Sequence, residues 1–173
     1  MLALSNFSFV CSFTIFLLIY TSPVLTSSLI PSSNYHAFAD HQERQIAVID
    51  VGGNPSGIAL DKRSNMMYVA LYSADAIAKI DPNNNRAIYR IPVGNGPQDV
   101  AFNDANGMIY VTNHDDNTVS VIDTNNVIVD TITVGIAPWD IAYNPANSKM
   151  YLTNQIDGTV SVIGIPPAVC ACP

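Results

Sequence analysis

The chain has 173 residues, enough for one modest domain, and it is 49% hydrophobic but only 12% charged. Its formal net charge is −7, and all 14 acidic and all 7 basic residues lie from Asp40 onward. Phosphate backbones and anionic lipid surfaces are bound by clustered lysine and arginine, so neither a nucleic acid nor an anionic membrane surface is expected as a partner.

The N-terminal segment 1–39 has the pattern of an export signal. The apolar run FSFVCSFTIFLLIY is shorter than the roughly 20 residues that a membrane-spanning helix needs. Ala37 and Ala39 occupy the small-residue positions of an Ala-x-Ala cleavage site. We therefore expect a signal peptide at 1–39, a mature start at Asp40, and a secreted or cell-surface protein. An uncleaved N-terminal anchor is the alternative, because no lysine or arginine precedes the apolar run.

From 40 to 165 the chain is an internal repeat, with a period of about 42 residues. Three markers recur once in each period: a Val-Gly pair, a proline shortly after it, and a tyrosine in a β-rich phrase. Residues 93–123 and 134–164 match at 17 of 31 positions, and the first copy is looser. The markers are Val51, Val93 and Val134; Pro55, Pro97 and Pro138; and Tyr68, Tyr110 and Tyr151.

Each period contains four runs that read as strands. In the middle copy they are QDVAF, MIYVTN, TVSVID and VIVDTITV, rich in β-branched and aromatic residues and separated by Asn, Asp and Gly. No long helical periodicity is present. Four antiparallel strands in about 42 residues is the pattern of a β-propeller blade. The predicted fold is therefore all-β, with about three blades near 51–92, 93–133 and 134–164.

The turn between the second and third strands of each copy is predicted from its residues. It is Ala-Asp at 74–75, Asp-Asn at 116–117 and Asp-Gly at 157–158. Asp, Asn and Gly tolerate the positive φ that such tight turns require. We therefore interpret these acidic residues as turn residues and not as ligands.

The phrase YVTN at 110–113, with TVSVID after it and VGxxPxDVA before it, resembles the YVTN-family β-propeller repeat. The resemblance covers about 46–165 and extends to propellers of the surface-layer type. The first copy departs from the pattern, because it has YVAL in place of YVTN and Gly57 in place of the Asp seen at 99 and 140. The resemblance implies an exported or cell-surface protein, and related propellers include lactonases and quinoprotein or haem-containing dehydrogenases.

Closed propellers usually have four to eight blades, and this chain has about three. The segment QIAVIDV at 45–51 reads as an orphan fourth strand that precedes the first blade, whereas the last copy ends on a third strand. Two hypotheses remain open. The chain forms an open arc, alone or with other partners, or two chains share one six-bladed ring as a homodimer.

Four residues are candidate binding residues: Asp99, Asp140, His114 and Trp139. Asp99 and Asp140 follow the repeat proline by two, so two blades would bring them near the central axis. They could bind calcium, which prefers oxygen ligands, or cap local turn N–H groups. His114 follows YVTN at a position that varies between copies, and Trp139 begins an inner strand.

Other repeated residues are expected to be structural. Asn113 and Asn154 are expected to hydrogen bond at a strand end, and the tyrosine and proline markers to pack or to begin strands. Cys170 and Cys172 lie in a tail at 166–173, where they would be exposed or would join two chains.

No catalytic motif is present. There is no Gly-x-Ser-x-Gly, no Cys-x-x-Cys-His, and no His and carboxylate set with metal-site spacing. The first hypothesis is an exported module that binds a protein or glycan at the cell surface without a cofactor. The alternative is a lactonase-like or dehydrogenase-like propeller enzyme, or a fragment of one.

Overall fold

The computed structural model describes residues 43–164; the expected signal peptide and the tail with Cys170 and Cys172 lie outside this range. The described chain forms eleven strands in three antiparallel sheets, with one 3-10 turn. The prediction of an all-β fold of about three propeller blades is confirmed. The described part contains no helix that is long and apolar enough to cross a membrane.

Each sheet is one repeat of the sequence, and its strands pair in chain order. Blade 1 contains β1 (Pro55–Asp61), β2 (Met66–Leu71), the 3-10 turn η1 (Tyr72–Ala74), β3 (Ala76–Asp81) and β4 (Arg86–Pro92). Blade 2 contains β5 (Pro97–Asn103), β6 (Met108–Asn113), β7 (Thr118–Ile122) and β8 (Ile128–Thr133). Blade 3 contains β9 (Pro138–Asn144), β10 (Lys149–Asn154) and β11 (Thr159–Ile163).

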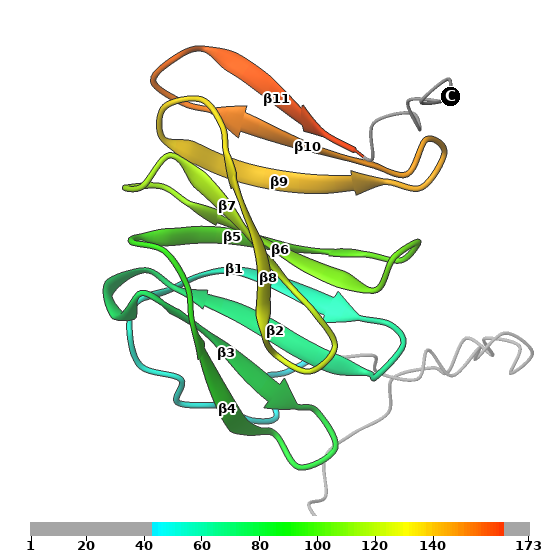
Figure 1. Ribbon diagram of the computed structural model, residues 1–173. Coiled ribbons are helices and arrows are strands. Elements are labelled where there is room, and N and C mark those ends of the chain that lie inside the picture. The colour runs from blue at the N-terminus through cyan, green and yellow to red at the C-terminus, as the bar shows by residue number, and fades with distance from the viewer. Residues whose placement is uncertain (1–42, 165–173) are drawn as a thin grey trace, which may run out of the picture. The chain divides into compact units, whose positions relative to one another are not determined.

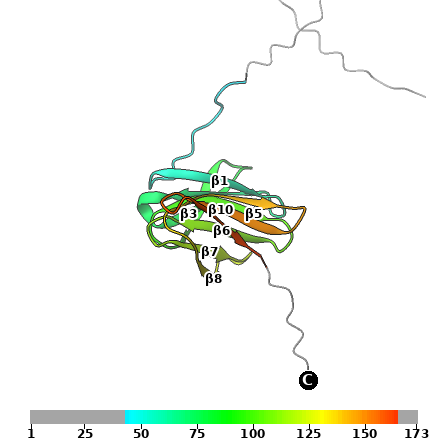
Figure 2. The same cartoon turned by 90° about the horizontal axis from the view of Figure 1, so that it is seen from above.

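The three blades stack in chain order (Figure 1), and they lie over one another when the stack is viewed from above (Figure 2). The first strands of the blades are neighbours, because β1 contacts β5 and β5 contacts β9. Each of these inner strands begins at a repeat proline, where a missing N–H costs no ladder hydrogen bond. Each of them also has an irregular register next to that proline, which separates the proline from the regular part of the ladder.

Apolar side chains fill the space between successive blades. Between blades 1 and 2 the cluster is Tyr68, Ile77, Ile91, Val100, Phe102, Ile109, Val111 and Ile122. Between blades 2 and 3 it is Ala101, Tyr110, Val119, Val121, Ile141, Met150 and Leu152. Successive side chains of a strand point to opposite faces, so one blade contributes alternate residues to each cluster.

The turns between the second and third strands have the predicted backbone. Asp75, Asn117 and Gly158 have φ of 48°, 57° and 63° at the equivalent position of the three copies. The Asp116 carboxylate accepts the N–H of Asn95 at 2.7 Å, and Asp157 accepts that of Ile136 at 2.6 Å. These two acids therefore tie the turn to the linker that enters their own blade.

The segment 45–51 differs from the expectation, because the structure assigns no strand there. A strand is defined by a hydrogen-bonded neighbour, and this segment has no ladder partner among the described residues. Its end is nevertheless anchored to blade 1. Val51 is buried, Ile49 is half-buried, and both pack on the face of blade 1 that points away from blade 2.

Candidate functional site

Four side chains from all three blades meet at one end of the stack, and we call them the loop cluster: Tyr72, His114, Asp115 and Trp139. Tyr72 belongs to η1, His114 and Asp115 directly follow β6, and Trp139 is the second residue of β9. Loops on a rigid β scaffold are where binding residues tend to lie, because their sequence can vary without loss of the core.

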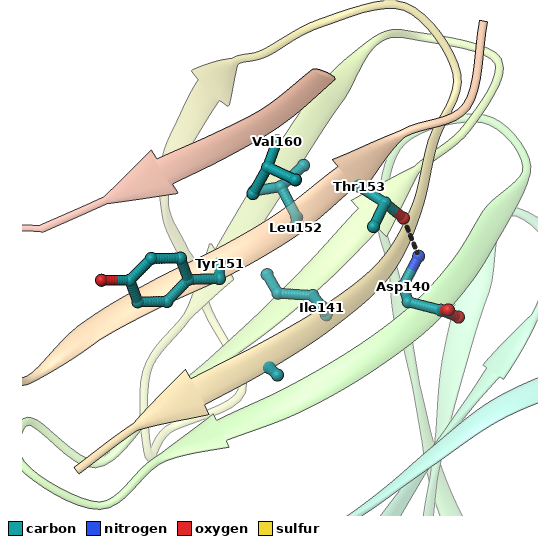
Figure 3. A pocket seen from close by; sticks show the side chains of 7 residues that line it. Asp140, Ile141, Tyr151, Leu152, Thr153 and Val160 are labelled. Atoms are coloured by element: carbon teal, nitrogen blue, oxygen red, sulfur yellow. Dashed lines mark hydrogen bonds between the residues drawn. The ribbon is translucent and has the colours of Figure 1, made fainter. Parts of the chain in front are cut away.

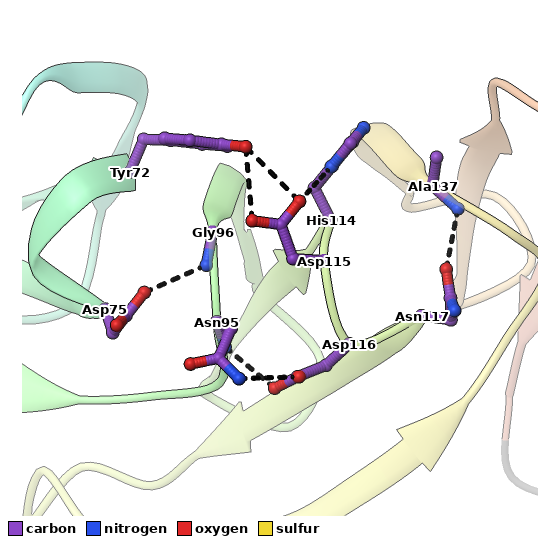
Figure 4. A network of polar contacts seen from close by, with 9 residues as sticks. All are labelled: Tyr72, Asp75, Asn95, Gly96, His114, Asp115, Asp116, Asn117 and Ala137. Atoms are coloured by element: carbon purple, nitrogen blue, oxygen red, sulfur yellow. Dashed lines mark hydrogen bonds and ion pairs between the residues drawn. The ribbon is translucent and has the colours of Figure 1, made fainter.

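The Asp115 carboxylate joins two members of the cluster, Tyr72 and His114 (Figure 4). The Tyr72 hydroxyl lies 3.2 Å from both of its oxygens, and His114 Nδ1 lies 2.6 Å from Oδ1. The hydrogen bond with His114 is the main reason that the pKa of Asp115 is below its ordinary value. Partial desolvation and the bond to Asp115 raise the pKa of Tyr72. The cluster therefore presents an ionised carboxylate shared by two ring side chains.

The rings of the cluster form a row across the blades. The centroid of the His114 ring lies 6.3 Å from that of Tyr72 and 5.7 Å from that of Trp139. The His114 and Trp139 rings meet edge-on, with an interplanar angle of 80°. Edge-on aromatic pairs are attractive because the positive edge of one ring meets the negative face of the other. Trp139 remains 37% exposed, so part of its ring surface is open to a ligand.

Links between blades support the same end of the stack. Asp75 Oδ1 accepts the N–H of Gly96 at 3.0 Å, and Asn117 Oδ1 accepts the N–H of Ala137 at 2.8 Å (Figure 4). In each case a turn residue of one blade binds the linker that enters the next blade. The positions of His114 and Trp139 relative to Tyr72 are therefore set by hydrogen bonds as well as by packing.

Asp99 and Asp140 begin neighbouring inner strands, but Asp99 has a partner between the blades. Its Oδ2 accepts the N–H of Ile141 in blade 3 at 2.9 Å. Burial raises the pKa of the Asp99 carboxyl, the N–H groups of Ile141 and Val100 lower it, and the nearby Asp140 carboxylate raises it. The two acids are thus neighbours, and one oxygen of Asp99 already binds backbone.

Gly57 stands in the first copy at the position of the repeat Asp, and it lies close to Asp99 of blade 2. A Cβ at Gly57 would lie 2.6 Å from the Asp99 Cα, closer than real Cβ contacts allow. Blade 1 therefore approaches Asp99 through a residue without a side chain. Among residues 43–164 no group of three or more His, Cys, Asp or Glu side chains is arranged to hold a metal ion.

The repeated asparagines lie at the ends of the second strands. The Asn113 amide nitrogen lies 3.0 Å from the Thr118 hydroxyl and 2.9 Å from that of Ser120. Asn154 repeats both contacts at 2.9 Å with Thr159 and Ser161. Each amide ties the end of the second strand to the third strand. Of the tyrosines, Tyr68 and Tyr110 are buried between blades, and Tyr151 is half-buried on the last blade.

Sequence reasoning selected His114 and Trp139 separately and missed both Tyr72 and Asp115. The two missed residues carry no motif, and the bond between them joins residues 43 positions apart. The periodicity contains one usable signal. Tyr72 and His114 occupy equivalent positions of the repeat. Equivalent positions lie at the same place in successive blades, so these two residues are expected on adjacent blades at the same end of the stack.

Known structures with this architecture are propeller proteins. The chain is similar to the hydrazine synthase of Kuenenia stuttgartiensis, with 20% identity and a TM-score of 0.56 over 62% of this chain and 31% of that chain. It is also similar to a streptogramin B lyase, with 16% identity and a TM-score of 0.52 over 66% of this chain and 42% of that one. A gluconolactonase from Xanthomonas campestris has 16% identity and a TM-score of 0.50 over 61% of this chain and 36% of its own.

These likenesses establish the fold alone, because the identities are low. The chain spans less than half the length of each of the three structures. A scan of known protein families finds none that matches the sequence, and a search of curated proteins finds none. The class that the fold defines is a set of β-propeller blades.

Proposed function

We propose that this protein is an exported or cell-surface binding module of YVTN-type propeller blades, and that the loop cluster contacts a protein partner. The signal segment at 1–39 and the blade repeat over 40–165 are parts of this proposal. The observation that carries it is the row of Tyr72, His114 and Trp139 from three blades at one end of the stack, with the Asp115 carboxylate bound to the first two of them.

Aromatic side chains at such a position favour a protein surface as the ligand. Tyr and Trp dominate the binding energy of protein interfaces, because they cover a large area and lose little conformational entropy. The cluster also contains an ionised carboxylate, and the whole chain has a net charge of −7. A partner surface with exposed Lys, Arg or other N–H donors would complement it.

The test is binding of the purified full-length protein to cells of the source organism, before and after protease or glycosidase treatment of the cells. Binding should be lost after protease treatment, and it should weaken as salt is raised. Trp139→Ala should reduce the affinity about 30-fold, the effect of a central interface residue worth about 2 kcal/mol. Tyr89→Ala is the matched control, because Tyr89 is an exposed aromatic on β4 outside the cluster.

Loss of binding after glycosidase treatment but not after protease treatment would show that the partner is a glycan and not a protein. If Trp139→Ala and Tyr89→Ala changed the affinity equally, the loop cluster would not be part of the binding interface.

One observation favours an enzyme as the second candidate function. His114 Nδ1 lies 2.6 Å from Asp115 Oδ1, an arrangement in which a carboxylate orients an imidazole for proton transfer. A lactonase-like activity or a redox centre in a larger propeller would use such a group. Hydrolysis of simple lactones that is lost in His114→Ala, or a visible absorption band in the purified protein, would favour this candidate over the binding module.

A further inference from the structure

Blade 3 has an apolar face that no other part of the described chain covers. This face carries a hollow of about 300 Å³ (Figure 3). Val160 and Val162 on β11 are 59% and 52% exposed, unusual for valines in the middle of a strand. We call this surface the outer face of blade 3; it consists of Asp140, Ala142, Tyr151, Thr153, Val160 and Val162.

Blade 2 uses the equivalent face to hold blade 3. Val119 and Val121, the counterparts of Val160 and Val162, are buried in the cluster between these two blades. Two polar contacts accompany the apolar ones. The Asp99 carboxylate accepts the N–H of Ile141, and the Thr112 hydroxyl donates to the carbonyl of Trp139 at 2.9 Å.

Blade 3 has the same two polar groups, a carboxylate and a hydroxyl, at the equivalent positions. Asp140 and Thr153 are the counterparts of Asp99 and Thr112. The Asp140 N–H donates to Thr153 Oγ1 at 3.2 Å, just as the Asp99 N–H donates to Thr112 Oγ1 at 2.9 Å (Figure 3). The outer face of blade 3 therefore repeats the donor, acceptor and apolar groups of an existing interface.

The complementary surface lies at the other end of the same chain. The face of blade 1 that points away from blade 2 carries an apolar set at the repeat positions by which blade 3 contacts blade 2. Two of its members are open to solvent, since Ile58 is 59% and Leu60 is 39% exposed. The set is Ile58, Leu60, Met67, Val69 and Ile80, and its counterparts in blade 3 are Ile141, Tyr143, Met150, Leu152 and Ile163.

We propose that the outer face of blade 3 binds blade 1 of a second copy of this chain, so that two copies close one six-bladed ring. The Asp140 carboxylate accepts the N–H of Ile58 of the second copy, and the Thr153 hydroxyl donates to the carbonyl of Ser56. The same contacts form again between the second copy and the first. This inference goes beyond the proposed binding function, because it names a different surface and a different partner.

The number of copies follows from the size of known propellers. A head-to-tail contact forms a closed ring or an open filament. Propellers typically have four to eight blades, so two copies with six blades fit this range, whereas three copies with nine blades fall outside it.

The segment 45–51 completes the ring at its outer edge. Within residues 43–164, β11 pairs only with β10, whereas β7 in the equivalent place pairs with both β6 and β8. Residues 45–51 align with β8 in the repeat and can add to β11 of the other copy. The Val119–Ile132 pair then predicts the register, with Ile49 of one copy opposite Val160 of the other.

The first test is the solution mass of the full chain, measured by light scattering as it is recovered from an exporting host, with and without reductant. The expected mass is twice that of one chain in both conditions. Val160→Lys should reduce the mass to one chain, because it places a charge in the contact. Val129→Lys is the matched control. Val129 is 53% exposed on blade 2, which already has both of its neighbours, so this variant should remain a dimer.

A cross-link tests the register without loss of the contact. Ile49→Cys and Val160→Cys are combined in a Cys170→Ser and Cys172→Ser background, and the protein is run on a non-reducing gel. A covalent dimer is expected, whereas Ile49→Cys with Val129→Cys should give none.

A monomeric protein would overturn the proposal, as would a dimer that is lost on reduction or that survives Val160→Lys. Cross-linking equal to that of the control pair would show that residues 45–51 do not add to β11 of a second copy.

Discussion

The contact of Asp99 with blade 3 predicts different effects for two substitutions at one position. Asp99→Ala removes the acceptor of the Ile141 N–H, which lies in a part-buried contact between blades. Asp99→Asn keeps an oxygen of similar size at the same place, so the N–H retains its acceptor. Since a buried donor left without a partner costs about 1–3 kcal/mol, we expect Asp99→Ala to be less stable than Asp99→Asn by about 2 kcal/mol.

The carboxylate also makes this contact dependent on pH. Because burial raises the pKa of Asp99 in the folded protein, the folded state keeps its proton to a higher pH than the unfolded state does. The free energy of unfolding then decreases as pH rises from the ordinary Asp pKa through the raised one. Asp99→Asn lacks this decrease, so its free energy of unfolding relative to that of the wild type should increase from pH 3 to pH 7.

Urea unfolding at a fixed protein concentration measures both effects. With a slope of about 2 kcal/mol per molar urea for a domain of this size, the midpoints of the Ala and Asn variants should differ by about 1 M. Asp130→Ala, an exposed acid on β8, should leave the midpoint near that of the wild type. Equal midpoints for Asp99→Ala and Asp99→Asn would refute the reasoning, since the N–H acceptor would then contribute nothing.

Two further predictions test the core and the loop cluster. Leu152→Ala should destabilise the protein by about 3 kcal/mol, because Leu152 is buried between blades 2 and 3, whereas Val129→Ala should cost less than about 0.5 kcal/mol in the same urea assay. His114→Ala should raise the pKa of the Asp115 carboxyl toward its ordinary value, because the hydrogen bond with His114 is the main cause of its lowered pKa. A carbon NMR titration of the carboxyl would show this, and an unchanged pKa would mean that the hydrogen bond with Tyr72 lowers it instead.

Positions that depend on neighbours in the sequence could be predicted. The inner strands begin at Pro55, Pro97 and Pro138, and the tight turns have positive φ at the expected sites. Proline, Asp, Asn and Gly determine these features through their own backbone preferences, and the repeat places them once in every blade. The count of about three blades followed from the same period.

Contacts between blades could not be predicted in the same way. The role of Asp99 as acceptor for Ile141, and the meeting of Tyr72 with Asp115, join residues one repeat apart in the chain. The sequence contains the period but not the angle and offset at which one blade lies on the next. The segment 45–51 shows the same limit, because it can become a strand only when another edge lies beside it.

The sequence by itself therefore determined the local structure of this protein: the strands, the turns and the order of the blades, which follow from residue preferences repeated three times. Only the tertiary structure decided which repeated residues act across blades, which of them form the loop cluster, and which apolar face remains uncovered. The physical reason is that side-chain contacts between sheets depend on how the sheets stack, and stacking is settled by the packing of all three blades together.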